Sequence, residues 1–335
     1  MKSVRSFRLS ALATVALGGL TSSPGTATDA SAQDAGIVES LDRLAGPAWL
    51  ARGDDFTSVL TYAWVVPGRV MTRERILFAD GEPVRHDRGA YQLDPVDGDL
   101  EFWIAGPDGE RHEGEVEPGP GGLWHLGRVV DGRSYRALVT VRSDTVMEHG
   151  SLPGGPGAPD GLVPRSGTLV YRRLSRAAVR EAAAEERSYM TRGAGEWGTP
   201  NPGAGSGPDT PERFLYRSRV AGDALRVDIA VELADGRSFT AWRIVSSYDA
   251  DAGVIRMHQV GSDGALLEGR MDPLPDGTTI VRMDGTGPGG ADITFMDRNI
   301  RDGPDTFRSV SWLLRDGAWQ ESMRSTWRRV GSPPG

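Results

Sequence analysis

Residues 79–118 read ADGEPVRHDRGAYQLDPVDGDLEFWIAGPDGERHEGEVEP, and residues 234–273 read ADGRSFTAWRIVSSYDADAGVIRMHQVGSDGALLEGRMDP, 155 positions further along the chain. Without any gap, 12 of these 40 positions are identical. Chance at this composition would give about three identities, so the match indicates a duplicated unit. Most shared positions are glycines and aspartates, and Arg88 matches Arg243. The chain is therefore predicted to contain one fold twice.

Short alternating segments separated by Asp-Gly pairs surround the repeat. Asp-Gly between alternating runs is the strongest short-range hairpin signal, because glycine accepts the positive φ of a tight turn. The predicted strands are 57–65, 69–78, 84–92, 99–105, 110–116, 122–130, 134–142 and 167–173 in the first unit, and 213–220, 224–233, 238–248, 254–260, 265–271, 278–284, 291–297, 305–314 and 318–330 in the second. A meander of this length removes its exposed edges by closing into an up-and-down barrel.

Two helices and two Gly/Pro-rich stretches complete the predicted organisation. The helices are 34–45 and 175–190, the second capped by Ser175. The Gly/Pro-rich stretches are 150–167 and 198–211. The expected fold is all-β, with a first barrel at 33–174, a helix and Gly/Pro-rich linker at 175–212, and a second barrel at 213–335.

The first 32 residues have the pattern of a secretory signal peptide. Lys2, Arg5 and Arg8 precede a short apolar run, and an Ala-x-Ala site ends at Ala32. The run is too short to span a bilayer, and no other stretch approaches that length. We therefore expect cleavage after Ala32 and a periplasmic or secreted location.

Composition excludes several function classes. The chain has no cysteine, so disulfides, thiolate metal sites and cysteine nucleophiles are ruled out. Its formal net charge is −8, which becomes −10 when residues 1–32 and their three positive and one negative charges are removed. An acidic chain without a basic run is a poor binder of nucleic acid or of anionic membranes.

Two short motifs are similar to those of the lipocalin-like, or calycin, barrels, in particular the uncharacterised bacterial secreted proteins of that type. Gly195-Glu196-Trp197 resembles the family's G-x-W, and Gly46-Pro47-Ala48-Trp49 resembles a version with one extra residue. Tyr171-Arg172-Arg173 and Trp327-Arg328-Arg329 are similar to the family's closing strand.

The resemblance implies that an arginine of the closing strand seals each barrel floor. It would do so by packing over Trp49 or Trp197 in a cation–π contact. Arg172 and Arg328 are the residues expected in this role, with Arg173 and Arg329 as their alternatives. The resemblance also implies a small hydrophobic ligand.

Glu74 is the most distinctive polar residue of the predicted strands. If the two copies keep the same side-chain parity, Val70, Thr72, Glu74 and Ile76 face the interior of the first barrel, as Leu225 to Leu233 do in the second. Burial would then raise the pKa of an unpaired Glu74, and His86 could face it from the next strand. A one-residue error in strand phase, or an arginine partner for Glu74, is the alternative.

Arg88 and Arg243 occupy equivalent positions in the two copies. Facing inward, either arginine could hold a ligand carboxylate through two hydrogen bonds, as fatty-acid-binding barrels do. Facing outward, each would form an ion pair across neighbouring strands, which is the favoured interpretation.

No cofactor or metal motif is visible. The five histidines do not have the spacing of a zinc site, the closing strands lack the histidine of haem-binding barrels, and Asp249 to Gly253 has the pattern of a turn. No nucleophile elbow, P-loop or dinucleotide fingerprint occurs.

Three functions remain open. The leading hypothesis is an exported, non-catalytic protein that binds a small hydrophobic or amphipathic ligand. An isomerase or hydratase acting on an isoprenoid-like substrate is the second, with Glu74 as the acid, His86 as the base and Arg88 as the anchor. A structural envelope-interaction module is the third. The positions at which the copies differ, Glu74 against Ile229 and His86 against Ala241, place any special site in the first copy.

Overall fold

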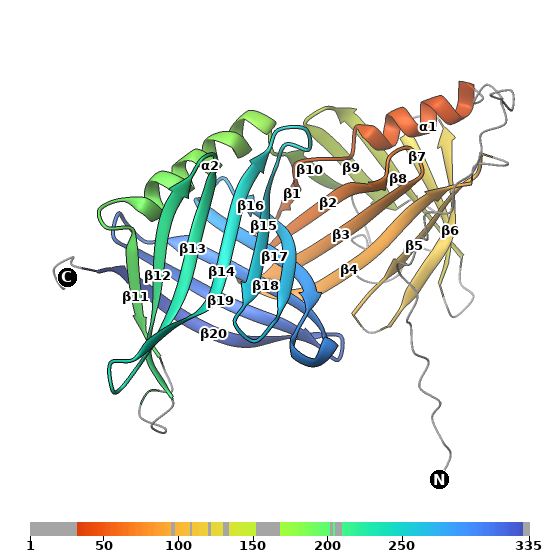
Figure 1. Cartoon of the computed structure of the whole chain (residues 1–335). Coiled ribbons are helices and arrows are strands. Elements are labelled where there is room, and N and C mark those ends of the chain that lie inside the picture. Colours follow the sequence, from red (N-terminus) through yellow and green to blue (C-terminus); the bar gives the residue numbers. More distant parts are fainter. Residues whose placement is uncertain are drawn as a thin grey trace, which may run out of the picture.

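The computed structural model describes residues 32–94, 98–107, 109–119, 122–129, 134–151, 168–201, 204 and 210–330. Nearly all of this part of the chain consists of antiparallel strands, which close into two consecutive ten-stranded barrels (Figure 1). The predicted fold, two antiparallel barrels with a helix between them, is confirmed. Residues 1–31, 152–167 and most of 202–209 lie outside the described residues, and with them the predicted signal peptide and much of the two Gly/Pro-rich stretches.

The first barrel follows helix α1 (Ala32–Asp42). Its strands are β1 (Trp49–Arg52), β2 (Phe56–Val66), β3 (Val70–Ala79), β4 (Glu82–Leu93), β5 (Leu100–Ala105), β6 (Arg111–Gly119), β7 (Gly122–Val129), β8 (Ser134–Ser143), β9 (Val146–Ser151) and β10 (Thr168–Arg173). Strand β1 pairs with both β2 and β10, which closes the sheet.

The second barrel follows helix α2 (Arg176–Thr191) in the same order. Its strands are β11 (Glu196–Pro200), β12 (Pro211–Ala221), β13 (Ala224–Leu233), β14 (Ser238–Asp249), β15 (Val254–Gly261), β16 (Leu266–Pro273), β17 (Thr278–Thr286), β18 (Asp292–Arg301), β19 (Thr306–Arg315) and β20 (Ala318–Arg329), with the 3₁₀ turn η1 (Pro288–Gly290) before β18. Strand β11 pairs with both β12 and β20, so the two barrels correspond strand for strand.

Three strands were not predicted from the sequence: β1, β9 and β11. Each is only four to six residues long, too short to show a clear alternating pattern. Because β11 is paired on both sides within the second barrel, that barrel begins inside the segment assigned to the linker at 175–212.

Among the described residues, Asp-Gly pairs form predicted turns between strands. Asp80 and Gly81 connect β3 to β4 with φ angles of 51° and 82°, and Gly236 before β14 has a φ of 81°. Only glycine, and less readily aspartate or asparagine, adopts this left-handed conformation without strain. The shared residues of the repeat therefore specify hairpins.

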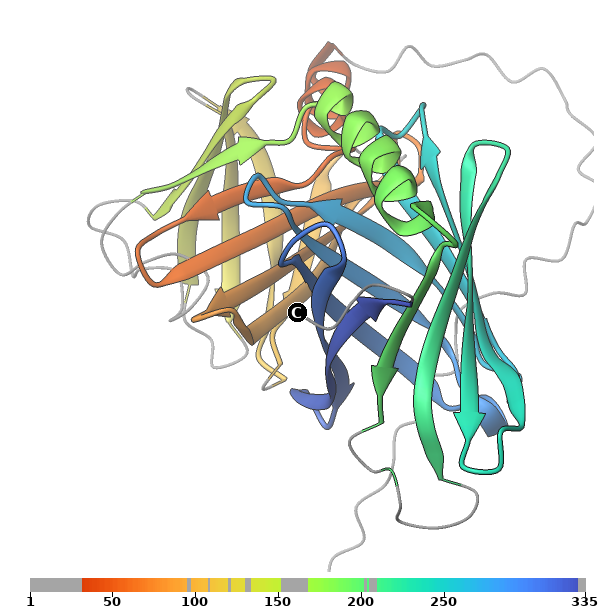
Figure 2. The same cartoon turned by 90° about the vertical axis from the view of Figure 1, so that its left-hand side faces the viewer.

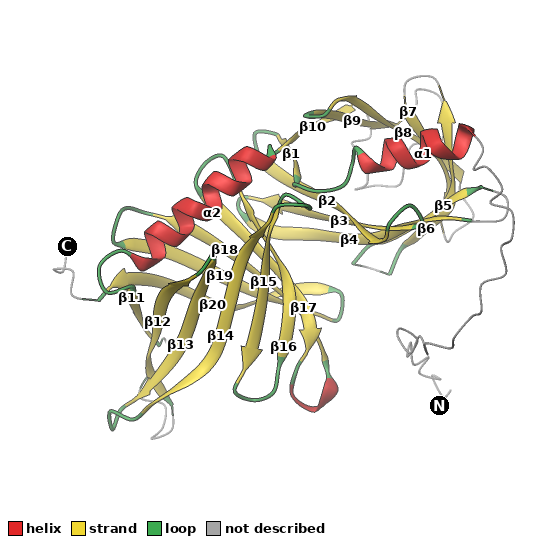
Figure 3. Cartoon of the chain, turned by 45° about the horizontal axis from the view of Figure 1, so that its top comes forward, coloured by secondary structure: helices red, strands yellow, loops and turns green. Residues whose placement is uncertain are grey.

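Helix α2 is capped by Ser175, whose side chain accepts a hydrogen bond from the Ala178 amide at 3.0 Å. The helix packs Val179 and Ala183 against Ile255 and Met271 of the second barrel. Both helices lie on the same side of the molecule, each over one end of its own barrel (Figure 3). Neither helix of the described chain has the length and hydrophobicity needed to cross a bilayer.

Both barrels have a floor made of a tryptophan covered by an arginine. The Arg173 guanidinium carbon lies 5.2 Å from the Trp49 ring centre, and that of Arg329 lies 4.1 Å from the Trp197 ring centre. Arg173 also donates to carbonyls just after α1, and Arg329 to carbonyls at and just beyond the end of α2. The alternatives Arg173 and Arg329 are thus the floor arginines, and the choice of Arg172 and Arg328 is wrong by one residue, since both are exposed on the outer face of their strands.

The outer face of β3 packs against the second barrel. Ile76 and Phe78 are buried in a cluster with Ile280, Met296 and Trp312. Figure 2 shows the strands of the two barrels approaching each other on this side. The contact joins the two barrels through a shared apolar layer.

Candidate functional site in the second barrel

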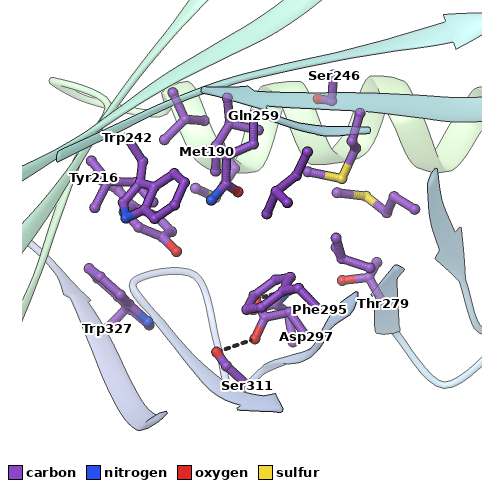
Figure 4. Close-up of a pocket in the computed structure, with 18 of the residues that line it drawn as sticks. Met190, Tyr216, Trp242, Ser246, Gln259, Thr279, Phe295, Asp297, Ser311 and Trp327 are labelled. Carbon is purple, nitrogen blue, oxygen red and sulfur yellow. Dashed lines mark hydrogen bonds between the residues drawn. The ribbon is translucent and has the colours of Figure 1, made fainter. Parts of the chain in front are cut away.

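A cavity of about 380 Å³ lies inside the second barrel (Figure 4). Alternate residues of the strands face it, because side chains of a strand point to opposite sides in turn. On β13 these residues are Leu225, Val227 and Ile229, which agrees with the interior face predicted for the second copy. The end of α2 also contributes, through Tyr189 and Met190.

The lining is mainly apolar and aromatic. Figure 4 shows Tyr216, Trp242 and Trp327 together at one side of the cavity. Tyr216 stacks on Trp327, with ring centres 4.0 Å apart and an interplanar angle of 27°. Burial raises the pKa of Tyr216 well above its ordinary value, so its hydroxyl stays protonated. This wall offers flat apolar surfaces and one hydroxyl.

Polar groups are concentrated on the inner face of β18. Asp297 accepts hydrogen bonds from the Ser311 hydroxyl at 2.8 Å and from the Asn299 amide at 3.2 Å. Burial raises the pKa of Asp297 to about 6, against the opposing effect of these two hydrogen bonds. Near neutral pH, part of the population therefore carries a protonated acid that can donate a hydrogen bond into the cavity.

Arg301 extends this polar face toward helix α2. Its guanidinium pairs with Glu186 and lies 4.7 Å from the ring centre of Tyr189. Glu186 and Tyr189 both belong to α2, so their contacts with Arg301 hold the last turns of this helix against the cavity wall. Gln259, Ser246 and Thr279 add isolated polar groups to an otherwise apolar lining.

Glu74 and His86 come together, but not inside a barrel. His86 Nε2 lies 2.7 Å from Glu74 Oε1, and the His86 ring stacks on Trp319 of the second barrel. Glu74 also pairs with Arg282, which reaches it from the outer face of β17. The prediction that Glu74 faces the interior of the first barrel is wrong: it lies at the junction between the barrels.

The electrostatics of this junction oppose acid catalysis. Burial alone would raise the pKa of Glu74, but Arg282, His86 and Arg88 hold it well below its ordinary range. A carboxylate that stays ionised at neutral pH cannot act as a general acid. The proposed catalytic set of Glu74, His86 and Arg88 therefore meets in a salt-bridge network, outside the cavity.

Arg88 and Arg243 both point outward, the orientation favoured from the sequence. Arg88 pairs with Glu74 at 3.4 Å and with Asp284 of the second barrel at 2.6 Å. Arg243 lies 3.5 Å from Asp228 on the neighbouring strand. Neither arginine reaches the cavity, so their assignment as ligand-binding residues is not supported by their positions.

A one-residue shift between the copies explains the misplacement of Glu74. The β3–β4 connection leaves two residues between strands, whereas the β13–β14 connection leaves four, and the equivalent pairs across the two hairpins are 14 positions apart in the first copy (88 − 74) and 15 apart in the second (243 − 228). Glu74 faces Arg88 across its hairpin, and Asp228 faces Arg243, so Glu74 corresponds to Asp228, 154 positions away. A shift of one residue moves every side chain of a strand to the opposite face of the sheet. Applying the offset of 155 to β3 therefore placed the outer face of this strand inside the barrel.

Sequence reasoning did not identify the polar residues of the cavity. Asp297, Asn299 and Arg301 occur at every second position, a pattern that places them on one face of a strand. The predicted strand ended at 297, which hid this pattern. Within the described ranges, no three His, Asp or Glu side chains come together as metal ligands.

Comparison with known proteins adds no relationship. No protein-family model matches the chain, and no curated protein matches it in sequence. The assignment of a function therefore rests on the geometry of the cavity.

Proposed function

We infer that the chain is a binding protein whose second barrel encloses a small, mainly apolar molecule with one polar group. The observation that carries this proposal is the cavity of about 380 Å³ inside that barrel. Its size lies in the range of about 300–1,000 Å³ common for small-molecule sites, which are also largely apolar with a few convergent polar groups.

The lining suggests how such a ligand is held. Trp242, Trp327 and Phe295 provide flat apolar contacts, and Asp297 supplies a hydrogen bond to a hydroxyl, carbonyl or amine. A protonated Asp297 donates and an ionised one accepts, so the preferred polar group depends on pH. A lipocalin-like identity and an exported location, suggested by the floor motifs and by residues 1–32, belong to the same proposal.

A neutral fluorescent probe tests the proposal directly. N-phenyl-1-naphthylamine brightens in apolar surroundings and carries no charge, so it suits a mainly apolar cavity. We expect saturable binding to the full chain, with a dissociation constant in the micromolar range. Native mass spectrometry with sterols, quinones and terpenes then identifies the natural ligand class.

Two adjacent residues of β14 provide a matched control. Ile244 lines the cavity, whereas Val245 is 40% exposed on the outside of the barrel. The substitution Ile244→Trp fills the cavity and should weaken probe binding at least tenfold, while Val245→Trp should leave it unchanged. Equal binding by both variants would contradict a site in the second barrel.

An enzyme acting on an isoprenoid-like substrate is the second candidate, now in the second barrel. The specific observation is Asp297, a carboxyl group with a pKa of about 6 in an apolar cavity. Such an acid can protonate a carbon–carbon double bond, and addition of water then completes hydration with return of a proton to the carboxylate. Incubation with isoprenoid alkenes should give products heavier by one water, absent with Asp297→Asn.

The third hypothesis, a structural envelope-interaction module, is favoured if both barrels are filled by their own side chains and the surface carries an apolar patch. The cavity in the second barrel does not meet that condition. The binding hypothesis is therefore preferred.

A further inference from the structure

Arg73 is buried inside the first barrel, and no carboxylate of the described residues is hydrogen-bonded to its terminal nitrogens. It lies on the inner face of β3, is only 2% exposed, and ranks among the largest fully buried side chains. Neither of its terminal nitrogens has a hydrogen-bond partner in the described part of the chain. Burial opposes the charge of this guanidinium, but Tyr62, Tyr91 and Asp87 nearby more than offset that effect and raise its pKa, so Arg73 stays charged.

The polar groups around Arg73 are hydroxyls and imidazoles. The Tyr62 hydroxyl lies beside the guanidinium, and the Tyr91 hydroxyl is 2.9 Å from His125 Nε2. Burial, reinforced by Arg73, lowers the pKa of His125 to about 3, and the same causes keep His149 neutral. None of these groups carries the negative charge that Arg73 requires.

Carboxylates inside this barrel already have other partners. Asp87 is fully buried and binds Arg75 through one oxygen and Arg85 through the other. Glu110 is 3.8 Å from Arg85 and 3.5 Å from His112. Among the described residues, three arginines therefore face two carboxylates, and the interior is one negative charge short.

The same positions in the second barrel are apolar. With the 154-residue correspondence of the strands, Arg73 matches Val227 and Arg75 matches Ile229, both of which line the apolar cavity. The arginines are thus not a requirement of the barrel fold, since the fold closes equally well without them.

We propose that the interior of the first barrel is a second binding site, specific for a small carboxylate anion held by the Arg73 guanidinium. Planar guanidinium and carboxylate groups form two parallel hydrogen bonds, and burial strengthens the pair. The tyrosine hydroxyls can donate to the same anion. Met71, Met147 and Phe102 lie in the surrounding core, so a short apolar tail on the carboxylate is compatible with the site. This site is independent of the function proposed for the second barrel.

Isothermal titration calorimetry of the full chain with sodium acetate and sodium hexanoate tests the proposal, with sodium chloride at equal ionic strength as the reference. We expect saturable, one-to-one carboxylate binding and a rise in melting temperature with carboxylate concentration. If acetate and hexanoate bind the wild-type protein no more tightly than chloride, and raise its melting temperature no more than chloride does, the proposal is wrong.

Variants locate the site. Arg73→Met should weaken carboxylate binding at least tenfold, because it removes the guanidinium that pairs with the anion and keeps a long side chain in the core. Arg142→Met, on the outside of the same barrel where Arg142 pairs with Glu148, should bind as the wild type does. Unchanged binding by Arg73→Met would refute the site, as would full affinity in Arg73→Leu. Binding of N-phenyl-1-naphthylamine should be the same in all these proteins.

Discussion

At the residue scale, Asp297 shows how a barrel interior changes a common side chain. It sits in a mainly apolar cavity with Ser311 and Asn299 as its hydrogen-bond donors, and its pKa rises from 3.8 to about 6. Because the folded state prefers the protonated acid, Asp297 favours folding most below about pH 4, and this contribution is lost as the pH rises through about 6. A shift of this size corresponds to roughly 3 kcal/mol.

Replacing Asp297 by asparagine should remove this pH dependence. Near pH 8, Asp297→Asn should be more stable than the wild type by about 2–3 kcal/mol, and near pH 4 the two should be similar. Urea unfolding at several pH values measures the difference. Asp292→Asn, at the exposed start of the same strand, controls for the loss of one carboxylate. A stability difference that does not change with pH would disprove the raised pKa.

At the element scale, each helix is fastened to its barrel by one arginine of the last strand. Arg329 donates to the carbonyls of Tyr189 and Arg192 at the end of α2, pairs with Asp305 at 2.7 Å, and lies over Trp197. A cation at a helix C-terminus is favourable, since the unpaired carbonyls carry partial negative charge. The Arg329 side chain thus caps helix α2, covers Trp197 at the barrel floor and binds the loop that contains Asp305.

The adjacent pair Arg328 and Arg329 tests this role. Arg329→Met removes charge-assisted hydrogen bonds and a desolvated cation–π contact, and should destabilise the second barrel by about 3 kcal/mol. Arg328→Met changes an exposed residue and should have little effect. Urea unfolding followed by tryptophan fluorescence distinguishes the two variants. Identical midpoints would show that the floor arginine adds no stability.

At the scale of the whole molecule, a charged network and an apolar layer hold the barrels together. Arg282 of the second barrel pairs with Glu74 of the first and with Asp272 of its own barrel at 2.6 Å. Arg88 of the first barrel pairs with Asp284 of the second barrel. Beside this network, Ile76 and Phe78 pack against Ile280. The two barrels should therefore unfold as one cooperative unit.

Removing Arg282 should separate the two unfolding events. Arg282→Met removes the shared partner of Glu74, which keeps His86 and Arg88, and of buried Asp272, which keeps Arg270. We therefore expect a loss near the lower end of the roughly 3–5 kcal/mol that breaking a buried pair costs. Differential scanning calorimetry should show one transition for the wild type and two for the variant. The control is Arg213→Met, which removes an arginine paired with Glu232 on the surface of the second barrel. A single unshifted transition in Arg282→Met would contradict this role of the junction.

The sequence by itself determined the local features of this protein. Turn residues such as Asp80-Gly81 specify hairpins through their own backbone preferences, and their repetition predicted two barrels. Ser175 and the alanine-rich run after it predicted α2, and the two floor tryptophans were recognised from their short motifs. These features depend on neighbouring residues along the chain, so they can be inferred without the fold.

Only the tertiary structure decided which faces turn inward and where a ligand can bind. Between equivalent pairs, the β13–β14 hairpin is one residue longer than the β3–β4 hairpin, so the offset between the copies changes from 155 to 154 at β3, which places Glu74 at the junction and Arg73 in the interior. The inward positions that line the apolar cavity of the second barrel, such as Val227 and Ile229, correspond to the charged Arg73 and Arg75 in the first barrel. Strand phase and interior volume depend on contacts between distant residues, and neighbouring residues alone do not specify them.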